Sequence, residues 1–176
     1  MSRARSIARE ILNDQENITL MDSTPLVFMH IVSLLMLPFV GISAVAVTVC
    51  LLTYLVRVFA LTAGFHRYFS HRAFKTHRVF QFVLAFLGGM SAQMGAIWWA
   101  SHHRRHHATS DTPEDPHSPR QHGFFYAHIG WLLCRKYAKA DHDCVGDLLQ
   151  YPELRLLDRF HAIPPLVLAF ATYGLG

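Results

Sequence analysis

The sequence predicts an all-α protein that is embedded in a membrane. Hydrophobic residues make up 52% of the 176 residues, and the mean hydropathy is +0.21. From Ser23 to Val56 the chain has 34 residues without Asp, Glu, Lys or Arg, whereas about 20 apolar residues suffice for one membrane-spanning helix. A further uncharged stretch of 23 residues runs from Val79 to Ser101. Because lipid offers the backbone no hydrogen-bond partners, such stretches are expected to be helical. The chain is short enough for one domain, residues 1–176.

The first uncharged stretch is expected to form a two-span N-terminal hairpin, with spans near residues 26–40 and 42–65. Pro38 and Gly41 mark the turn between the spans. The turn carries no Lys or Arg, whereas basic residues flank both spans. The positive-inside rule therefore places the turn away from the cytoplasm. The polar arm of residues 1–22 and the histidine-rich helices are then expected on the cytoplasmic side.

The second uncharged stretch, residues 79–101, is long enough to cross the membrane but is expected to return to the side from which it enters. A crossing would separate His71 from His103 by about 30 Å, and a shared metal site would then be impossible. Gly88 and Gly89 allow the stretch to bend as an interfacial or re-entrant helix. The alternative is a plain third span with unrelated histidines on its two sides.

Two dense histidine clusters, at residues 66–71 and 102–107, predict a metal site. If the second cluster is α-helical, His103, His106 and His107 lie within roughly 100° of one another on one face. His66 and His71 would lie 140° apart on an α-helix, so they are expected to bind different ions or to sit at a helix end. Imidazole is a suitable ligand for iron, copper, zinc and nickel.

Other site classes are disfavoured by composition and motif. The net charge of +4 comes from Lys and Arg beside apolar segments, which indicates a membrane surface and not nucleic acid. The three cysteines are odd in number and share no CxxC spacing, so no disulfide framework or zinc–cysteine site is expected. The HExxH motif of zinc metalloproteases is absent. His102 remains an alternative to His103 in the second cluster.

Proline and polar residues organise the chain after the second cluster. Three prolines at positions 113, 116 and 119 are expected to end the histidine-bearing helix and to form an extended loop. Residues 123–137 are aromatic and amphipathic, and residues 141–159 are polar. A new apolar segment at 163–176 is interpreted as the start of a third span, which is incomplete at Gly176.

The two histidine clusters resemble the first two histidine boxes of the membrane-bound fatty-acid desaturase family, in its acyl-CoA (stearoyl-CoA type) Δ9 branch. The sequence His66-Arg-Tyr-Phe-Ser-His71 matches the first box, HxxxxH, and His103-Arg-Arg-His106-His107 matches the second, HxxHH. Residues 111–119 and 123–133 also look like the segment that follows the second box. One departure is the pair Ser101-His102, which stands where Arg-Asp is usual.

The resemblance implies an oxidoreductase that introduces a cis double bond into a fatty acyl-CoA or acyl-lipid. It implies two Fe²⁺ ions held by about nine histidines from three boxes, with O₂ as co-substrate. Electrons would come from a ferredoxin, a rubredoxin or a b-type cytochrome with its reductase. The protein would be multi-pass, in the inner membrane of a bacterium or otherwise in the endoplasmic reticulum. Carried over by position, the iron ligands are His66, His71, His103, His106 and His107.

The resemblance also assigns residues to the substrate. Gln93 and Trp99 match positions that shape the acyl tunnel, and Arg135 and Lys136 match a pair that binds the phosphates of CoA. The third histidine box does not occur in the 176 residues, so the chain alone is expected to be inactive. Two alternatives stay open: a related membrane di-iron hydroxylase or alkane monooxygenase, and a non-catalytic desaturase remnant that binds metal.

Overall fold

The computed structural model describes residues 20–175, which are helical and contain no β-strand. They form two compact units, one from residues 42–105 and 140–175 and the other from residues 20–41 and 106–139. The all-α prediction is therefore confirmed for the described residues. Most of the predicted N-terminal arm, residues 1–19, lies outside them.

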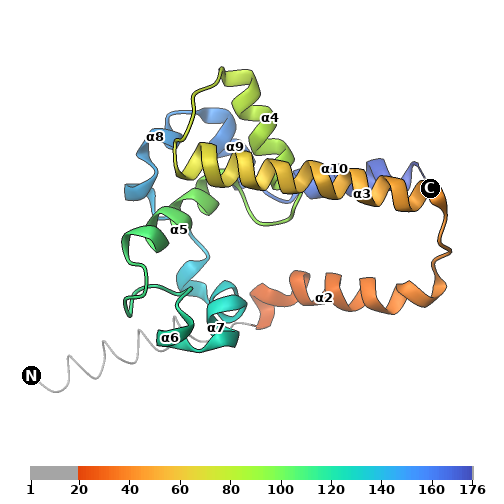
Figure 1. Ribbon diagram of the computed structural model, residues 1–176, viewed down its shortest axis with the longest axis horizontal. Helices are drawn as coiled ribbons and strands as arrows, with labels where there is room; N and C mark the ends of the chain where they lie inside the picture. Colours follow the sequence, from red (N-terminus) through yellow and green to blue (C-terminus); the bar gives the residue numbers. More distant parts are fainter. Residues whose placement is uncertain (1–19, 176) are drawn as a thin grey trace, which may run out of the picture. The chain divides into compact units, whose positions relative to one another are not determined.

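The first unit is built on one long helix (Figure 1). It begins as α3 (Ala44–Phe59) and continues as a π-helix, η2 (Ala60–Ser70). The Ser43 hydroxyl accepts a hydrogen bond from the Ala46 amide at 3.0 Å and caps the first turn. Within residues 20–175, the segment Ala44–Ser70 is the one helix that is long and apolar enough to cross a membrane. This helix contains most of the expected span at 42–65 and continues beyond it, through the first histidine box to Ser70.

The second uncharged stretch, residues 79–101, is not one straight helix. It is divided between α4 (Arg78–Gly89) and α5 (Ala96–Ala108). Ala92 and Met94, in the connection, have left-handed backbone conformations with φ of 57° and 65°. The chain therefore turns after Gly88 and Gly89, at residues 90–95, and not at the glycines themselves.

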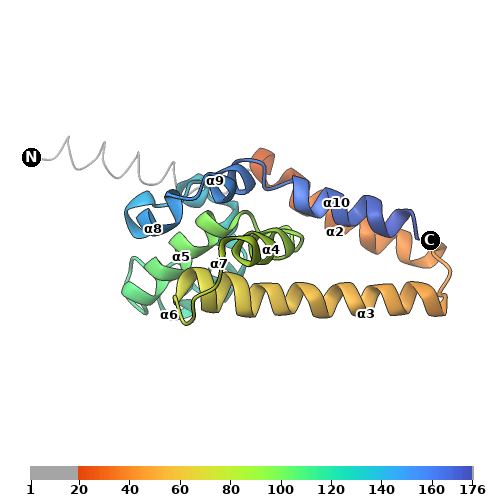
Figure 2. The ribbon, with the colours of Figure 1, turned by 90° about the horizontal axis from the view of Figure 1, so that it is seen from above.

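A buried apolar core joins the elements that carry the two histidine boxes. Phe65 and Phe69 of η2, Leu84 of α4 and Ile97 of α5 are almost completely inaccessible to solvent. Val145, Leu148 of α8 (Gly146–Leu149) and Leu154 of α9 (Pro152–Arg159) complete this core. Figure 2 shows α4 beside the η2 end of the long helix. Burial of each large apolar side chain contributes about 1.5–3 kcal/mol, so the core fixes η2 relative to α4.

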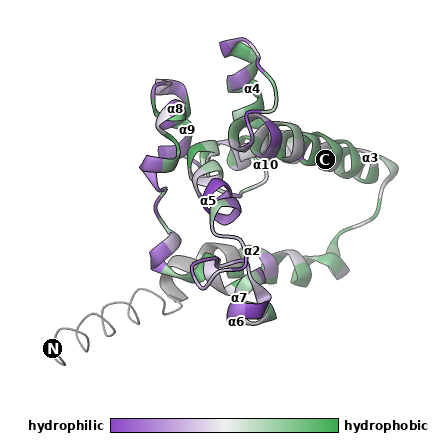
Figure 3. Cartoon of the chain, turned by 60° about the vertical axis from the view of Figure 1, so that its left-hand side comes forward, coloured by the Kyte–Doolittle hydropathy of each residue, from purple (hydrophilic) through white to green (hydrophobic). Residues whose placement is uncertain are grey.

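The apolar side chains of α3 point outward. Val45, Leu51, Leu52 and Leu55 are more than half exposed, and α3 is hydrophobic along much of its length (Figure 3). An exposed apolar surface of this extent is typical of a helix that faces lipid. The apolar helices Val27–Phe39, Arg78–Gly89 and α10 (Ile163–Tyr173) are shorter than a full span. The two-span hairpin and its orientation stay predictions.

The second unit contains α2 (Leu20–Met36), the 3₁₀ turn η1 (Leu37–Phe39) and a set of short helices from the middle of the chain. These short helices are α6 (Pro119–His122), α7 (Phe124–His128), η3 (Gly130–Leu133) and η4 (Arg135–Tyr137). Helix α5 ends at Ala108, before the three prolines, as the sequence predicts. In the first unit, η5 (His142–Cys144) leads into α8.

Replacing Gly88 with alanine is expected to destabilise the first unit. A Cβ atom at Gly88 would clash with the aromatic ring of Phe65, which cannot move away because it is fully buried. Overpacking of this kind costs about 1–3 kcal/mol, so the midpoint of thermal unfolding in detergent should fall. Gly146→Ala is the matched control, because a Cβ there meets no atom within 4 Å. Equal midpoints for the two variants would contradict the close approach.

Candidate metal centre

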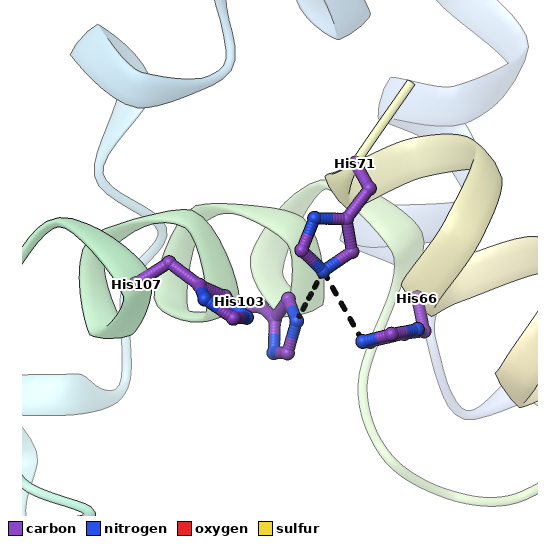
Figure 4. A group of neighbouring side chains, drawn as sticks. All are labelled: His66, His71, His103 and His107. Atoms are coloured by element: carbon purple, nitrogen blue, oxygen red, sulfur yellow. Dashed lines mark hydrogen bonds between the residues drawn. The ribbon is translucent and has the colours of Figure 1, made fainter. Parts of the chain in front are cut away.

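Three histidines of the first unit bring their Nε2 atoms together. The Nε2 atom of His71 lies 3.2 Å from that of His66 and 3.2 Å from that of His103 (Figure 4). The ring centroids of the three pairs are separated by 4.5–5.1 Å. A neutral imidazole has one N–H and one lone pair, so three converging ring nitrogens form a set of lone-pair donors suited to a cation. The structure therefore joins the two sequence boxes at one point.

The π-helix explains how His66 and His71 meet. In a π-helix the backbone hydrogen bonds run between residues five apart, and the His71 amide donates to the His66 carbonyl at 3.0 Å. Residues five apart therefore lie above one another, and the 140° separation predicted from α-helical geometry is wrong. His71 is the residue that caps the end of η2, whereas His66 lies inside it, so the expected position at a helix end holds for His71 alone.

A fourth histidine is placed by helix α5 itself. His107 lies one turn after His103 on this continuous helix, at the i, i+4 spacing that puts two side chains on one face. One ligand atom from each of His66, His71, His103 and His107 lies within 4.8 Å of all the others. His66 and His103 are partly buried, whereas His71 and His107 are exposed. The histidine group therefore packs against protein on the side of His66 and His103 and is exposed to solvent on the side of His71 and His107.

Aromatic side chains form the supported side of the group. The Trp99 ring stacks on the His103 ring at a centroid distance of 4.7 Å and an interplanar angle of 25°. Trp99 also contacts Phe65 of the buried core at 5.9 Å, and its indole N–H donates to Oε1 of Gln93 at 3.3 Å. The structure therefore brings Gln93 and Trp99, both predicted from the sequence, together beside the histidines.

His106 turns to a different partner, within the second unit. Its Nδ1 atom lies 2.8 Å from Oδ1 of Asp115, a carboxylate that is only 1% exposed. Asp115 also accepts hydrogen bonds from the amides of Asp111 and His117. Burial acts to raise the pKa of Asp115, but the hydrogen bonds from His106 and the two amides outweigh it, and the pKa is lowered. A carboxylate at Nδ1 holds the tautomer whose Nε2 has the lone pair. His106 as an iron ligand stays a prediction.

The remaining predicted residues lie elsewhere. The Nδ1 atom of His102 lies 2.9 Å from the Trp98 carbonyl oxygen, and the His102 ring lies over the Trp98 ring at 4.2 Å. His103, and not His102, therefore joins the group. Arg135 and Lys136 are exposed neighbours in η4, and the Lys136 ammonium lies 5.5 Å from the centre of the Tyr137 ring. Their role toward CoA stays a prediction.

The chemistry of the donor set suits a transition metal. Imidazole nitrogen is a good ligand for iron, zinc, copper and nickel, whereas calcium and magnesium prefer oxygen. The four grouped side chains are all imidazoles, without a thiolate or a carboxylate among them. A divalent iron ion therefore fits the residues that the structure brings together.

Comparison with known sequences decides the family. Residues 42–175, which contain both histidine boxes, match the sequence profile of the family described as "Fatty acid desaturase". The chain belongs to the fatty acid desaturase family. The resemblance seen in the two boxes is thus confirmed at the level of the family.

Several desaturases are similar to this family member. The chloroplastic palmitoyl-monogalactosyldiacylglycerol delta-7 desaturase of Arabidopsis thaliana is 36% identical over 152 residues, which cover 84% of this chain and 40% of that protein. Delta(9)-fatty-acid desaturase fat-6 of Caenorhabditis elegans is 40% identical over 66% of this chain and 35% of that protein. Human stearoyl-CoA desaturase 5 is 35% identical over 68% of this chain and 37% of that protein. The chain therefore spans two-fifths or less of the length of these relatives.

Proposed function

We propose that the protein is a membrane-bound di-iron desaturase of fatty acyl chains. The observation that carries the proposal is the convergence of four imidazoles, from both boxes, in a chain of the desaturase family. His66, His71, His103 and His107 would hold iron, and His106, oriented by Asp115, is proposed as a further ligand. The three relatives described above are named as desaturases, which favours this function over the hydroxylase and alkane monooxygenase alternatives.

The chain's residues would supply ligands, orientation and exclusion of water. Bound iron would activate O₂ for removal of two hydrogens from adjacent methylenes of the acyl chain, with two electrons and two protons consumed and two waters formed. The electrons are proposed to come from a ferredoxin, a rubredoxin or a b-type cytochrome with its reductase. The Trp99 ring, stacked on His103 and tied to Gln93, offers an apolar surface beside the histidines on which a saturated chain can lie.

Substrate class and location are part of the same proposal. The relatives' names include both a CoA-linked and a lipid-linked substrate. We favour acyl-CoA for this chain, with Arg135 and Lys136 holding its phosphates as charged hydrogen-bond donors. Ala44–Ser70 would cross the bilayer as one of several spans of a single domain, with both histidine boxes on the cytoplasmic side, and the proposed products are cis-unsaturated acyl chains.

Deletion of the gene in its own organism is the direct test. The proposal expects the deletion to lower the fraction of one class of unsaturated fatty acid in the membrane lipids, as measured by gas chromatography of their methyl esters. The unaltered gene should restore this fraction, and the His71→Ala form should not. An unchanged fatty-acid profile would contradict desaturation, and restoration by both forms would contradict the role of His71.

The 176-residue polypeptide alone is proposed to bind iron without completing the di-iron centre. Its two boxes provide five of the roughly nine histidines that the family resemblance implies. Purified polypeptide supplied with donor, O₂ and stearoyl-CoA should give no more unsaturated product than a metal-free control. Product above that control would overturn this part of the proposal.

A further inference from the structure

We propose that Arg104 is a positioning residue that sets the approach of the first histidine box to the second. Arg104 follows His103 directly in α5, and its partners include the carbonyl groups that directly precede His71. The proposal rests on the proposed function, because it assumes that the grouped histidines hold a metal.

The guanidinium of Arg104 uses all of its nitrogen atoms. Nε donates to the Ser70 carbonyl at 3.1 Å, and Nη2 donates to the Phe69 carbonyl at 2.5 Å. Nη1 donates to the Cys144 carbonyl at 2.7 Å and to Oδ1 of Asp147 at 2.6 Å, and Nη2 also reaches Oδ2 of Asp147 at 3.0 Å. These bonds match the five N–H donors of a guanidinium.

The carbonyl partners explain why an arginine is suited to this position. The last carbonyl groups of a helix have no intrahelical partner, and Phe69 and Ser70 are the last two residues of η2. A planar fork can bind two successive carbonyls and a carboxylate at once, whereas a lysine ammonium is a single point on a flexible stem. The Arg104 side chain is 13% exposed, so packing restricts its position further.

Asp147 anchors the guanidinium from the opposite side. Burial acts to raise the pKa of Asp147, but hydrogen bonds from Arg104 and Arg72 outweigh it, and the pKa of this carboxyl is lowered. Arg104 therefore lies among a carboxylate and three carbonyl oxygens, which compensate the cost of taking its charge out of water. Because Arg104 is tied on both sides, α5 cannot rotate or slide without breaking several of these bonds.

The consequence concerns the distance between the two boxes. The bonds to Phe69 and Ser70 hold the end of η2 against the residue next to His103, and the Nε2 atoms of His71 and His103 lie 3.2 Å apart. Loss of the fork would let this end of η2 shift relative to α5. A shift of an ångström is large against metal-ligand distances of about 2 Å, so metal affinity should respond more than global stability does.

The test is a Co²⁺ titration of the 176-residue polypeptide in detergent, with the visible absorption of the bound ion as the signal. Arg104→Lys and Arg104→Gln are expected to bind Co²⁺ about 10- to 100-fold more weakly than the wild type, the usual effect of losing a residue that orients metal ligands. Their absorption bands should also change in intensity, because band intensity reports the arrangement of the ligands.

Arg72→Gln is the matched control. Arg72 binds the same carboxylate, with its Nε atom 3.0 Å from Oδ2 of Asp147, but its side chain is 62% exposed. The structure gives it no bond to the Phe69 or Ser70 carbonyl. The proposal expects Arg72→Gln to keep the Co²⁺ affinity and spectrum of the wild type. A folded Arg104 variant with wild-type affinity and spectrum overturns the proposal, and so does an equal loss in Arg72→Gln.

Asp147→Asn keeps the test decisive if the Arg104 variants do not fold. This change leaves the carbonyl bonds of Arg104 in place and removes only the charge of its anchor, so Co²⁺ affinity should fall by less than in the Arg104 variants. Wild-type affinity in a folded Asp147→Asn protein would overturn the proposal. A wild-type polypeptide that binds no Co²⁺ or Fe²⁺ would instead contradict the proposed function, which separates the two failures.

Discussion

Replacing His71 with alanine is expected to lower the affinity of the polypeptide for Fe²⁺ by about 100-fold or more. The Nε2 atom of His71 is the one that lies 3.2 Å from both His66 and His103, so its loss opens the centre of the group. Substitution of residues that only orient a metal ligand already costs 10- to 100-fold in affinity, and loss of a proposed ligand should cost at least the upper part of this range. Anaerobic titration in detergent measures it.

His102→Ala is the control for the His71 experiment. This histidine lies in the same helix as His103, but its Nδ1 atom faces the Trp98 carbonyl and its ring lies over the Trp98 ring. Its removal should therefore leave Fe²⁺ affinity unchanged. Equal Fe²⁺ affinities for wild type and His71→Ala would remove the main support for the metal centre. A large loss of affinity in His102→Ala would indicate that the metal is bound at a different position on α5.

The same comparison separates what the sequence can predict from what it cannot. The i, i+3, i+4 spacing of the second cluster predicts one helical face, and α5 confirms the helix. The pattern does not reveal that His106 instead turns to Asp115, nine residues later and outside the helix. This contact depends on how the loop after α5 folds and buries Asp115, which helical spacing does not encode.

The predicted separation of His66 and His71 in the first cluster is wrong for a different reason. Spacing arguments assume α-helical geometry, with 100° per residue, whereas η2 is a π-helix in which residues five apart stack. The π-helix is rare enough that no spacing rule selects it. The HxxxxH pattern therefore leaves open the two possibilities named from the sequence, ligands of different ions or a position at a helix end.

Ionic contacts between residues far apart in the chain also could not be predicted from the sequence. The sequence motifs assign no role to Arg104, yet its side chain is mostly buried among carbonyls and the carboxylate of Asp147, 43 residues away. Its role depends on tertiary contacts with η5 and α8, two short elements that carry little hydrophobic pattern. In contrast, the break in residues 79–101 follows from the need to bring both boxes to one point, and that expectation required only the motif.

The second prediction with a large expected effect concerns Asp158, which caps α5 from another helix. Gly95, the residue before α5, has no side chain to bind the first free amides, and Oδ1 of Asp158 accepts a hydrogen bond from the Trp98 amide at 2.9 Å. Asp158→Ala should leave this partly buried amide without a partner and cost about 1–3 kcal/mol in the free energy of unfolding. Chemical denaturation in detergent, with Asp143→Ala as an exposed control, measures the loss.

Asp158→Asn should cost less and should change how stability depends on pH. Burial raises the pKa of Asp158 above its ordinary value of 3.8, and the hydrogen bond from the Trp98 amide only partly offsets this effect. The folded state therefore holds the proton more tightly than the unfolded state, so Asp158 stabilises most below pH 3.8. This contribution is lost as the pH rises through the raised pKa of the folded state. Asparagine keeps an oxygen acceptor but does not titrate. The stability of the wild type relative to Asp158→Asn should therefore decrease as the pH rises from 3.8 through the raised pKa of Asp158. An increase over the same interval would show that the amide and the positive end of α5 outweigh burial at this carboxylate.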